Sequence, residues 1–303
     1  MMRILTGTNA TIVASNKQMD TASLARIALD RFGNDFAGAI LDNGATALSY
    51  SDASASGNSA IAFACTSRAR GPSGQPQPGT WETDTRGAFV GYKITPATQN
   101  IGGGTSQAIP SLNRGDGRLT CSVQAIASKA SANFWDVFGT GNARIPNDLT
   151  VNPAANTAIP PTRPDEQVLN WQVIASGIFR LHISFALDDG TIVQTPPAYK
   201  NFFVNAGPGG CVPIAFSKAT SADASQRFVK GLIVGIAGFD ESTRNLSYGN
   251  DNNFWTTIGG QIVRPTAARQ VPLTVWNQNL PNITFGPARQ NLRTYQRFFS
   301  LTL

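Results

Sequence analysis

The chain has 303 residues, of which 41% are hydrophobic and 14% charged, and its formal net charge is +6. Its longest apolar run, residues 232–239, is far shorter than the ~20 residues of a transmembrane helix, and the N-terminal residues turn polar before a signal-peptide core could form. We therefore expect neither a transmembrane segment nor a signal peptide, and we expect folding in the cytoplasm.

The choice of polar residues indicates mainly β structure. Only three Glu and six Lys occur, whereas Asp, Asn, Ser, Thr, Gly and Pro are frequent. Glu and Lys are typical of helix surfaces, and the frequent residues are typical of turns and strand ends. Arginine makes up 18 of the 24 basic residues (24 minus six Lys), and Arg is enriched at protein interfaces. Cys65, Cys121 and Cys211 lack paired spacing, so we expect reduced thiols rather than disulfides or a zinc site.

In the first half of the chain, residues 21–32 are predicted as a helix with Leu24, Ile27, Ala28 and Phe32 on one face, although the same pattern permits a strand. Gly- and Pro-rich segments predict exposed loops. The remaining predictions for this half are strands at 60–65, 88–94 and 119–126, a short helix at 130–138, loops at 71–79 and 101–111, and a semi-rigid connector at 152–165.

The clearest strand is predicted at residues 178–187 in the second half. Apolar Phe179, Leu181, Ile183, Phe185 and Leu187 alternate there with mostly polar residues, a pattern typical of a half-buried strand. A turn at 188–190 and a hairpin return at 191–193 are expected to follow. The remaining predictions are strands at 212–216, 228–239, 261–263, 273–276 and 298–303, and a short helix at 288–296.

A short sequence phrase recurs in the chain. Asn133-Phe134-Trp135 and Asn253-Phe254-Trp255 begin 120 positions apart (253 minus 133), and each is followed in the same order by Gly, Arg and a Leu-Thr-Val triplet. This spacing is about the length of one β-domain. The repeat predicts two tandem β-sandwich domains at residues 1–155 and 156–303, with short helices.

Few residues are candidates for catalysis or metal binding. Any Ser-His-Asp or Cys-His arrangement would need His182, the single histidine, which is predicted on the polar side of its strand. The carboxylate pairs Glu82 with Asp84 and Asp240 with Glu241 are the candidates for glycoside cleavage. Asp188, Asp189 and Asp251 could help to bind a hard cation, but their spacing fits no calcium loop. We predict no enzymatic activity, no cofactor, no metal ion and no small-molecule substrate.

Three arginines recur near the end of the chain at intervals of four. Arg289, Arg293 and Arg297 would form one basic stripe on the predicted helix. A stripe of this kind is either a solvated face or a contact with acidic groups of a neighbouring subunit or with phosphate groups. We take these residues as the candidate subunit or phosphate contact.

The chain resembles the double jelly-roll major capsid proteins of tailless, membrane-containing bacteriophages. The resemblance rests on the length, on two successive β-domains with the recurring Asn-Phe-Trp phrase, and on the lack of a catalytic motif. It implies two eight-stranded jelly rolls per chain, homotrimeric pseudo-hexagonal capsomers and an icosahedral shell, which would place the chain in the virion. The expected partners are copies of the chain, other virion proteins, and an internal membrane or the packaged genome.

Two other functions stay open from the sequence. A phage baseplate, tail or receptor-binding protein would share the same composition. A β-sandwich that binds or cleaves carbohydrate would instead need an aromatic-lined cleft and, for cleavage, two facing carboxylates.

Overall fold

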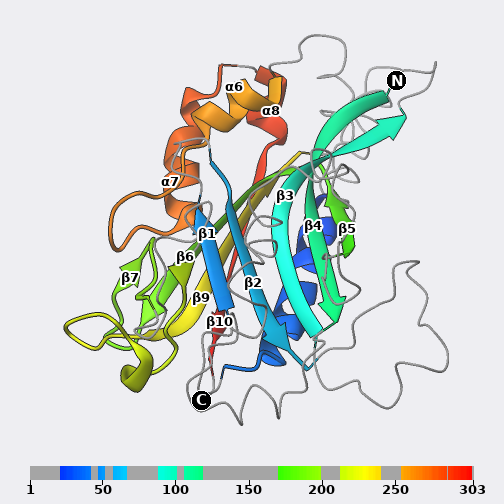
Figure 1. Cartoon of the computed structure of the whole chain (residues 1–303). Helices are drawn as coiled ribbons and strands as arrows, with labels where there is room; N and C mark the ends of the chain where they lie inside the picture. The colour runs from blue at the N-terminus through cyan, green and yellow to red at the C-terminus, as the bar shows by residue number, and fades with distance from the viewer. Residues whose placement is uncertain are drawn as a thin grey trace, which may run out of the picture.

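The computed structural model describes residues 21–41, 47–51, 57–66, 88–100, 106–118, 170–198, 212–239, 254–284 and 286–301. In these residues two antiparallel sheets pack against each other, and helices cover parts of both (Figure 1). The prediction of a mainly β protein with a few short helices is confirmed. No helix within these ranges is long and apolar enough to cross a membrane.

The larger sheet has six strands in the order β5-β4-β3-β2-β1-β8. Its centre is a long hairpin in which β3 and β4 pair from Ala88 with Arg118 to Asn100 with Ser106. The predicted loop at 101–111 is therefore wrong from residue 106 onward, because buried Ile109 and Ser111 belong to β4. The strands are β1 (Ala47–Ser51), β2 (Ser59–Cys65), β3 (Ala88–Asn100), β4 (Ser106–Arg118), β5 (Asn170–Ser176) and β8 (Val212–Pro213).

The smaller sheet has the order β10-β9-β6-β7. Its strand β6 has the predicted bounds, and the predicted turn and hairpin return follow it, with Gly190 in the left-handed conformation (φ +81°). The strands are β6 (Ile178–Leu187), β7 (Ile192–Val193), β9 (Val229–Gly238) and β10 (Arg293–Ser300).

Strands from both predicted domains share the six-stranded sheet. β5 pairs with β4, and β8 pairs with β1, so the strand pairing does not separate residues 1–155 from 156–303. The boundary near residue 155 and the first Asn-Phe-Trp lie outside the described residues, as do the predictions at 71–79, 119–126 and 130–138.

The main hydrophobic core lies between the two sheets. On β6, Leu181, Ile183 and Phe185 point inward, because alternate side chains of a strand share a face. They join buried residues of the six-stranded sheet such as Ile61 and Phe63. Each such side chain contributes roughly 1.5–3 kcal/mol when fully buried.

A helix of residues 21–37 packs against this core and lies behind β2 to β4 in Figure 1 (blue). Its Phe32 ring contacts Phe63, Tyr92 and Phe299 at centroid distances of 6.0, 4.9 and 5.1 Å. The helix therefore joins β2 and β3 of one sheet to β10 of the other. The predicted helix is confirmed but extends further, and Ile27, predicted on the apolar face, is exposed. The buried face is instead formed by Ala25, Ala28, Leu29, Phe32 and Phe36.

A buried ion pair fixes this helix to the larger sheet. Asp35 accepts hydrogen bonds from Arg114 Nε on β4 and from the Tyr92 hydroxyl on β3, both at 2.5 Å. Burial, together with the neighbouring Asp35, raises the pKa of Tyr92 far above its usual range, so Tyr92 stays protonated and donates its hydrogen bond. The charge on Arg114, which is itself buried, is balanced by Asp35.

Three short helices cover the outer face of the smaller sheet, seen at the upper left of Figure 1. They are α6 (Phe254–Gln261), α7 (Pro272–Asn279) and α8 (Gly286–Asn291), and the short 3-10 turns η2 (Lys218–Thr220) and η3 (Leu280–Asn282) complete the helical elements. A second core lies beneath them and includes Phe179, Ile258, Ile262 and the fully buried Trp276. The strands predicted at 261–263 and 273–276 are wrong: residue 261 ends α6, and 273–276 belong to α7, which begins at Pro272.

Helix α7 lies directly on β9 because residue 235 has no side chain. A Cβ atom built on Gly235 would lie 2.4 Å from Pro272 Cβ and 3.1 Å from Trp276 Cη2. We expect Gly235→Ala to push α7 away from the sheet and to destabilise the protein by about 1–3 kcal/mol in urea unfolding. Gly260→Ala in α6 is the matched control, because its Cβ would meet nothing within 4 Å; there we expect no loss, or a gain of up to about 1 kcal/mol. Equal behaviour of the two variants would contradict this packing.

Candidate functional site

The three candidate arginines lie on two different elements. Arg289 belongs to α8, whereas Arg293 and Arg297 belong to β10. The predicted helix at 288–296 is therefore wrong after residue 291, and the three residues do not form one helical stripe. Arg293 and Arg297 still share a face of β10, because residues four apart in a strand point the same way.

Each arginine has a different environment. Arg293 Nη1 donates to the backbone carbonyls of Gln290 and Leu292 at 2.8 and 2.9 Å, so it satisfies carbonyl groups at the end of α8. Arg297 forms an ion pair with Asp30 of the 21–37 helix, and its guanidinium lies 5.3 Å from the centre of the Phe299 ring. Arg289 is exposed.

The Arg297–Asp30 pair lies in a surface that combines charged and apolar side chains. The 21–37 helix contributes Arg26, with 85% of its side chain exposed, and Ile27, which is 59% exposed. Strand β10 contributes Phe298, which is 56% exposed on the opposite side of the strand from Arg297. Besides these, Val173 is the one further exposed large hydrophobic residue in the described ranges. Strand β10 is at the edge of its sheet, so side chains from both of its sides border that edge. We call Arg26, Ile27, Asp30 and Arg297, together with Phe298 on the other side of β10, the helix–β10 surface.

Sequence reasoning found one residue of this surface, Arg297, and missed the others. Ile27 was assigned to the apolar face of its helix, although the buried positions 25, 28, 29, 32 and 36 place residue 27 on the opposite side. Phe298 was predicted as part of a terminal strand, and its exposure follows from its position on an edge strand beyond α7. The sequence contains the information needed to place Ile27: when the helix is extended to Phe36, its apolar stripe runs through Ala25, Ala28, Leu29, Phe32 and Phe36, and Ile27 lies outside this stripe.

The polar face of β6 is buried rather than solvated. Arg180, His182 and Ser184 are at most 2% exposed. A β-bulge at residue 179 turns both Phe179 and Arg180 toward α6. Arg180 then donates to the carbonyls of Gly259 and Ile262 in and next to this helix, and to Gly57 O before β2.

Two side chains at the start of β2 bind the backbone of β6. Leu181 N–H donates to Asn58 Oδ1 at 3.0 Å, and Ile183 N–H donates to Ser59 Oγ at 3.2 Å. Asn58 Nδ2 donates in turn to Phe179 O at 3.2 Å. These side chains make the hydrogen bonds that a neighbouring strand would otherwise make, and they connect the two sheets.

His182 links this arrangement to the loop before α7. The Gln194 amide donates to the carbonyls of Ala267 and Gln270, so its Oε1 must act as an acceptor. His182 Nε2 therefore carries the proton and donates to Gln194 Oε1 at 2.8 Å, which leaves Nδ1 facing Ser59 Oγ at 3.4 Å. Burial lowers the pKa of His182 to about 4, and the positive charges of Arg264 and Arg180 act in the same direction.

The contacts of His182 differ from those of a Ser-His-Asp triad. Its second partner is the neutral amide of Gln194, and the Ser59 hydroxyl already accepts the Ile183 N–H. A triad instead needs a carboxylate to orient and stabilise the imidazolium. The geometry therefore gives His182 a positioning role between β6 and the loop before α7.

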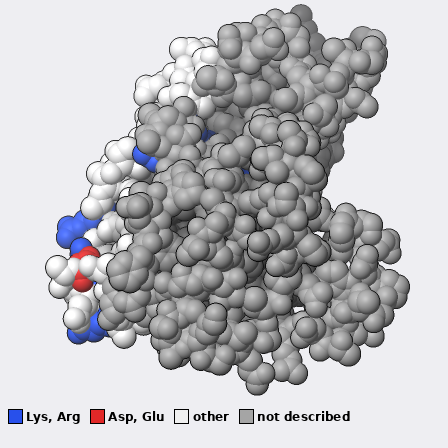
Figure 2. Space-filling view, in the orientation of Figure 1, with Lys and Arg blue, Asp and Glu red and all other residues white. Residues whose placement is uncertain are grey.

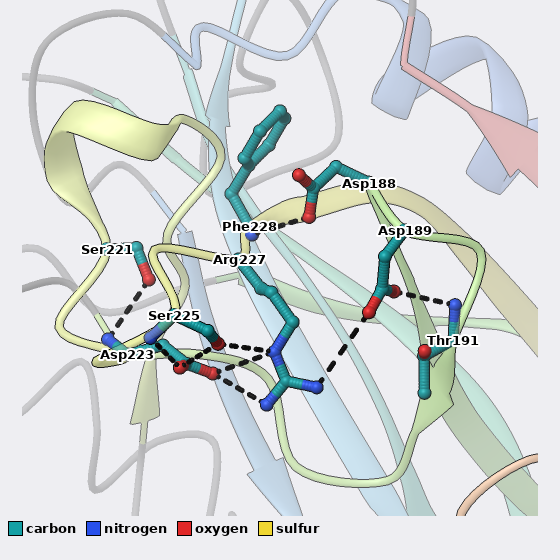
Figure 3. Close-up of polar contacts among 8 residues, drawn as sticks. All are labelled: Asp188, Asp189, Thr191, Ser221, Asp223, Ser225, Arg227 and Phe228. Atoms are coloured by element: carbon teal, nitrogen blue, oxygen red, sulfur yellow. Dashed lines mark hydrogen bonds and ion pairs between the residues drawn. The ribbon is translucent and has the colours of Figure 1, made fainter.

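A third group of polar residues connects the loops beside β7 and β9 (Figure 3). Asp223 accepts from the Ser225 hydroxyl and backbone N–H and from Arg227, which lower the pKa of Asp223 to about 2. Arg227 Nη1 also lies 4.0 Å from Asp189 Oδ2. Asp189 accepts the Thr191 N–H at 2.8 Å, which lowers the pKa of Asp189. On this side of the molecule acidic and basic side chains lie next to each other (Figure 2).

Asp188 and Asp189, which were considered as possible cation ligands, are turn residues with protein partners. Asp188 Oδ1 accepts the Phe228 N–H at 3.2 Å, and Asp189 is bonded as described above. Asp251 and the carboxylate pairs Glu82 with Asp84 and Asp240 with Glu241 lie outside the described residues. Within the described ranges, no group of three or more His, Cys, Asp or Glu side chains is placed to hold a metal ion.

Comparison with known proteins adds no assignment: no family model matches the chain, and no curated protein is significantly similar to it.

Proposed function

We propose that this chain is a structural protein of a virus particle, a capsid protein whose function is to assemble with copies of itself. In this proposal the two antiparallel sheets form a jelly-roll sandwich, and bacteriophage capsomers are homotrimers within an icosahedral shell. Because β5 pairs with β4, the assembling body includes strands from both halves of the chain.

The helix–β10 surface carries this proposal. It contains two large exposed apolar side chains, Ile27 on the helix and Phe298 on the side of β10 opposite Arg297, together with Arg26 and Arg297. Protein interfaces are enriched in aromatic residues and Arg, and a few such residues supply most of the binding energy. The sandwich beneath is held by the buried Asp35–Arg114 pair and the Phe32 cluster, so the surface is presented on a packed scaffold.

The composition of the chain is consistent with assembly. Arg is three times as frequent as Lys (18 against six), and Arg pairs with carboxylates in fixed two-point geometry, which suits specific contacts between subunits. Of the three arginines first considered, Arg297 is the one on the helix–β10 surface, whereas Arg293 is bonded to the end of α8 and Arg289 belongs to α8.

The test is the association state of the purified protein. We expect sedimentation velocity to show self-association that increases with concentration, and negative-stain microscopy to show shells or flat arrays. Phe298→Ser should weaken association at least roughly tenfold, the effect of removing an interface aromatic. Val173→Ser is the matched control, because Val173 is also exposed (47%) but lies on β5, and it should assemble like the wild type.

The outcomes separate the candidate functions. A protein that stays monomeric at all concentrations would overturn the capsid proposal. Tubes or spikes in place of shells would favour a tail or baseplate protein. Glycan binding or turnover by the monomer would favour the carbohydrate-specific function.

A further inference from the structure

The 21–37 helix presents one continuous exposed stripe. Its exposed or half-exposed members are Ser23, Arg26, Ile27, Asp30, Asn34 and Ala37. At 3.6 residues per turn these six positions fall within about 100° of the helix circumference. The buried positions occupy the opposite side, so the stripe faces away from the core.

The order of side chains along this stripe is self-complementary. Arg26 and Asp30 are one turn apart, and their side chains are 3.9 Å apart within one helix. If a second copy of the helix packs antiparallel with its centre near residue 28, Arg26 of each copy faces Asp30 of the other. Ile27 of one copy then lies beside Ile27 of the second, and the small side chain of Ser23, one turn before Ile27, lets the two helices approach closely.

We propose that the 21–37 helix forms a two-fold symmetric contact with the same helix of a second copy, with Arg26 paired to Asp30 across the axis and Ile27 at the centre. The proposal rests on the proposed function and specifies one of its contacts. A two-fold contact is isologous, whereas contacts around a trimer are heterologous. This contact would therefore join subunits of neighbouring trimers.

The charged side chains next to Arg26 and Asp30 are compatible with this antiparallel pairing of two helices. Asp30 also pairs with Arg297 of its own chain, and a carboxylate has two oxygens that can accept from two guanidinium groups. Arg31, half-exposed at the side of the stripe, is directed toward Asp35, with Nε 3.7 Å from its Oδ2. Ile27 supplies apolar contact that is exposed to water in a single chain.

Complementary charge variants test this contact. Arg26→Asp gives each helix two carboxylates at the two-fold axis, and Asp30→Arg gives each helix two guanidinium groups there. In a homodimer of either variant these like charges face each other and repel. Each variant alone should therefore associate at least roughly tenfold more weakly than the wild type. An equal mixture of the two should recover association, because the two carboxylates of one variant then face the two guanidinium groups of the other. Native mass spectrometry of the mixture should show mixed dimers in excess of either homodimer.

Two further variants make the result decisive. Lys218→Asp reverses an exposed charge on η2, away from the helix, and should associate like the wild type. Ile27→Ser should weaken association without changing the melting temperature, since Ile27 is exposed.

Each result has one meaning. Association of both charge variants at the wild-type level, or a mixture that forms no mixed dimers, would overturn the two-fold helix contact. If Phe298→Ser still blocks assembly in that case, the proposed function survives and the contact lies elsewhere on the helix–β10 surface. If the wild type never associates, the proposed function itself fails.

Discussion

Acidification from about pH 6.5 to about pH 4 is expected to cost the wild-type protein roughly 3 kcal/mol of unfolding free energy through His182 alone. The native pKa of His182 is about 4, and its ordinary value is 6.5. Between these values the unfolded chain binds a proton that the native protein does not bind. Stability is therefore present above this window and is lost as the pH falls through it.

The physical cause lies in the surroundings of the imidazole. His182 is buried, and Arg180 and Arg264 are the charged groups that act on it. Its other neighbours, Ser59 and Gln194, are neutral. A proton on Nδ1 would add a third positive charge, and the two hydrogen bonds now present cannot compensate for the lost hydration.

The measurement is urea unfolding of the wild type and of His182→Gln at a series of pH values. The Gln side chain can still donate to Gln194 Oε1 but does not titrate. The stability difference between the two proteins should favour the wild type most at neutral pH and should shrink by roughly 3 kcal/mol by about pH 4. The pKa of Asp223 is lowered from 3.8 to about 2, so this carboxyl group titrates below the pH range of the measurement, and it is present in both proteins. A difference that stays constant between about pH 6.5 and pH 4 would contradict the assignment.

The largest single loss of stability is expected from Asp35→Asn, at about 3–5 kcal/mol, because this change leaves Arg114 charged and buried without its carboxylate. Tyr92 would also lose the charged acceptor of its hydrogen bond. The loss should be measured as a shift of the urea midpoint at unchanged slope.

Asp30→Asn is the matched control, because it makes the same change from carboxylate to amide on the same helix and so has the same effect on helix propensity. Asp30 also pairs with an arginine, but both side chains are about half exposed (48% and 49%). Exposed pairs of this kind contribute at most about 1 kcal/mol. Similar losses from the two variants would show that the burial of Asp35 is not what makes its ion pair important.

The elements that were predicted correctly are those that residue patterns within one short segment determine. The bounds of β6 follow from the alternation of apolar residues between Phe179 and Leu187, and the following turn follows from Asp188-Asp189-Gly190. The β-bulge that turns Phe179 away from Leu181 is not visible in this pattern. Alternation could not tell that the polar side of β6 is buried, because α6 and the loop before α7 cover it from more than 70 residues away along the chain. The polar residues there are buried because they have partners, and sequence spacing does not reveal those partners.

The order of strands in the sheets was also beyond local reasoning. β5 follows β4 by more than 50 residues and β8 joins β1 from a still greater distance, yet both pairings complete one sheet. In the C-terminal region, apolar residues of α6 and α7 fit strand and helix patterns equally well over three or four residues. The same ambiguity placed Arg289, Arg293 and Arg297 on one helix, where the structure has a helix followed by a strand.

The ion pair between Asp30 and Arg297 joins residues separated by 267 positions. During synthesis the ribosome therefore releases the helical part of the helix–β10 surface long before β10 exists. At roughly 5–20 residues per second, the delay is tens of seconds, during which a nascent chain lacks the complete surface. Until β10 has been translated, Asp30 of a nascent chain cannot form its ion pair with Arg297.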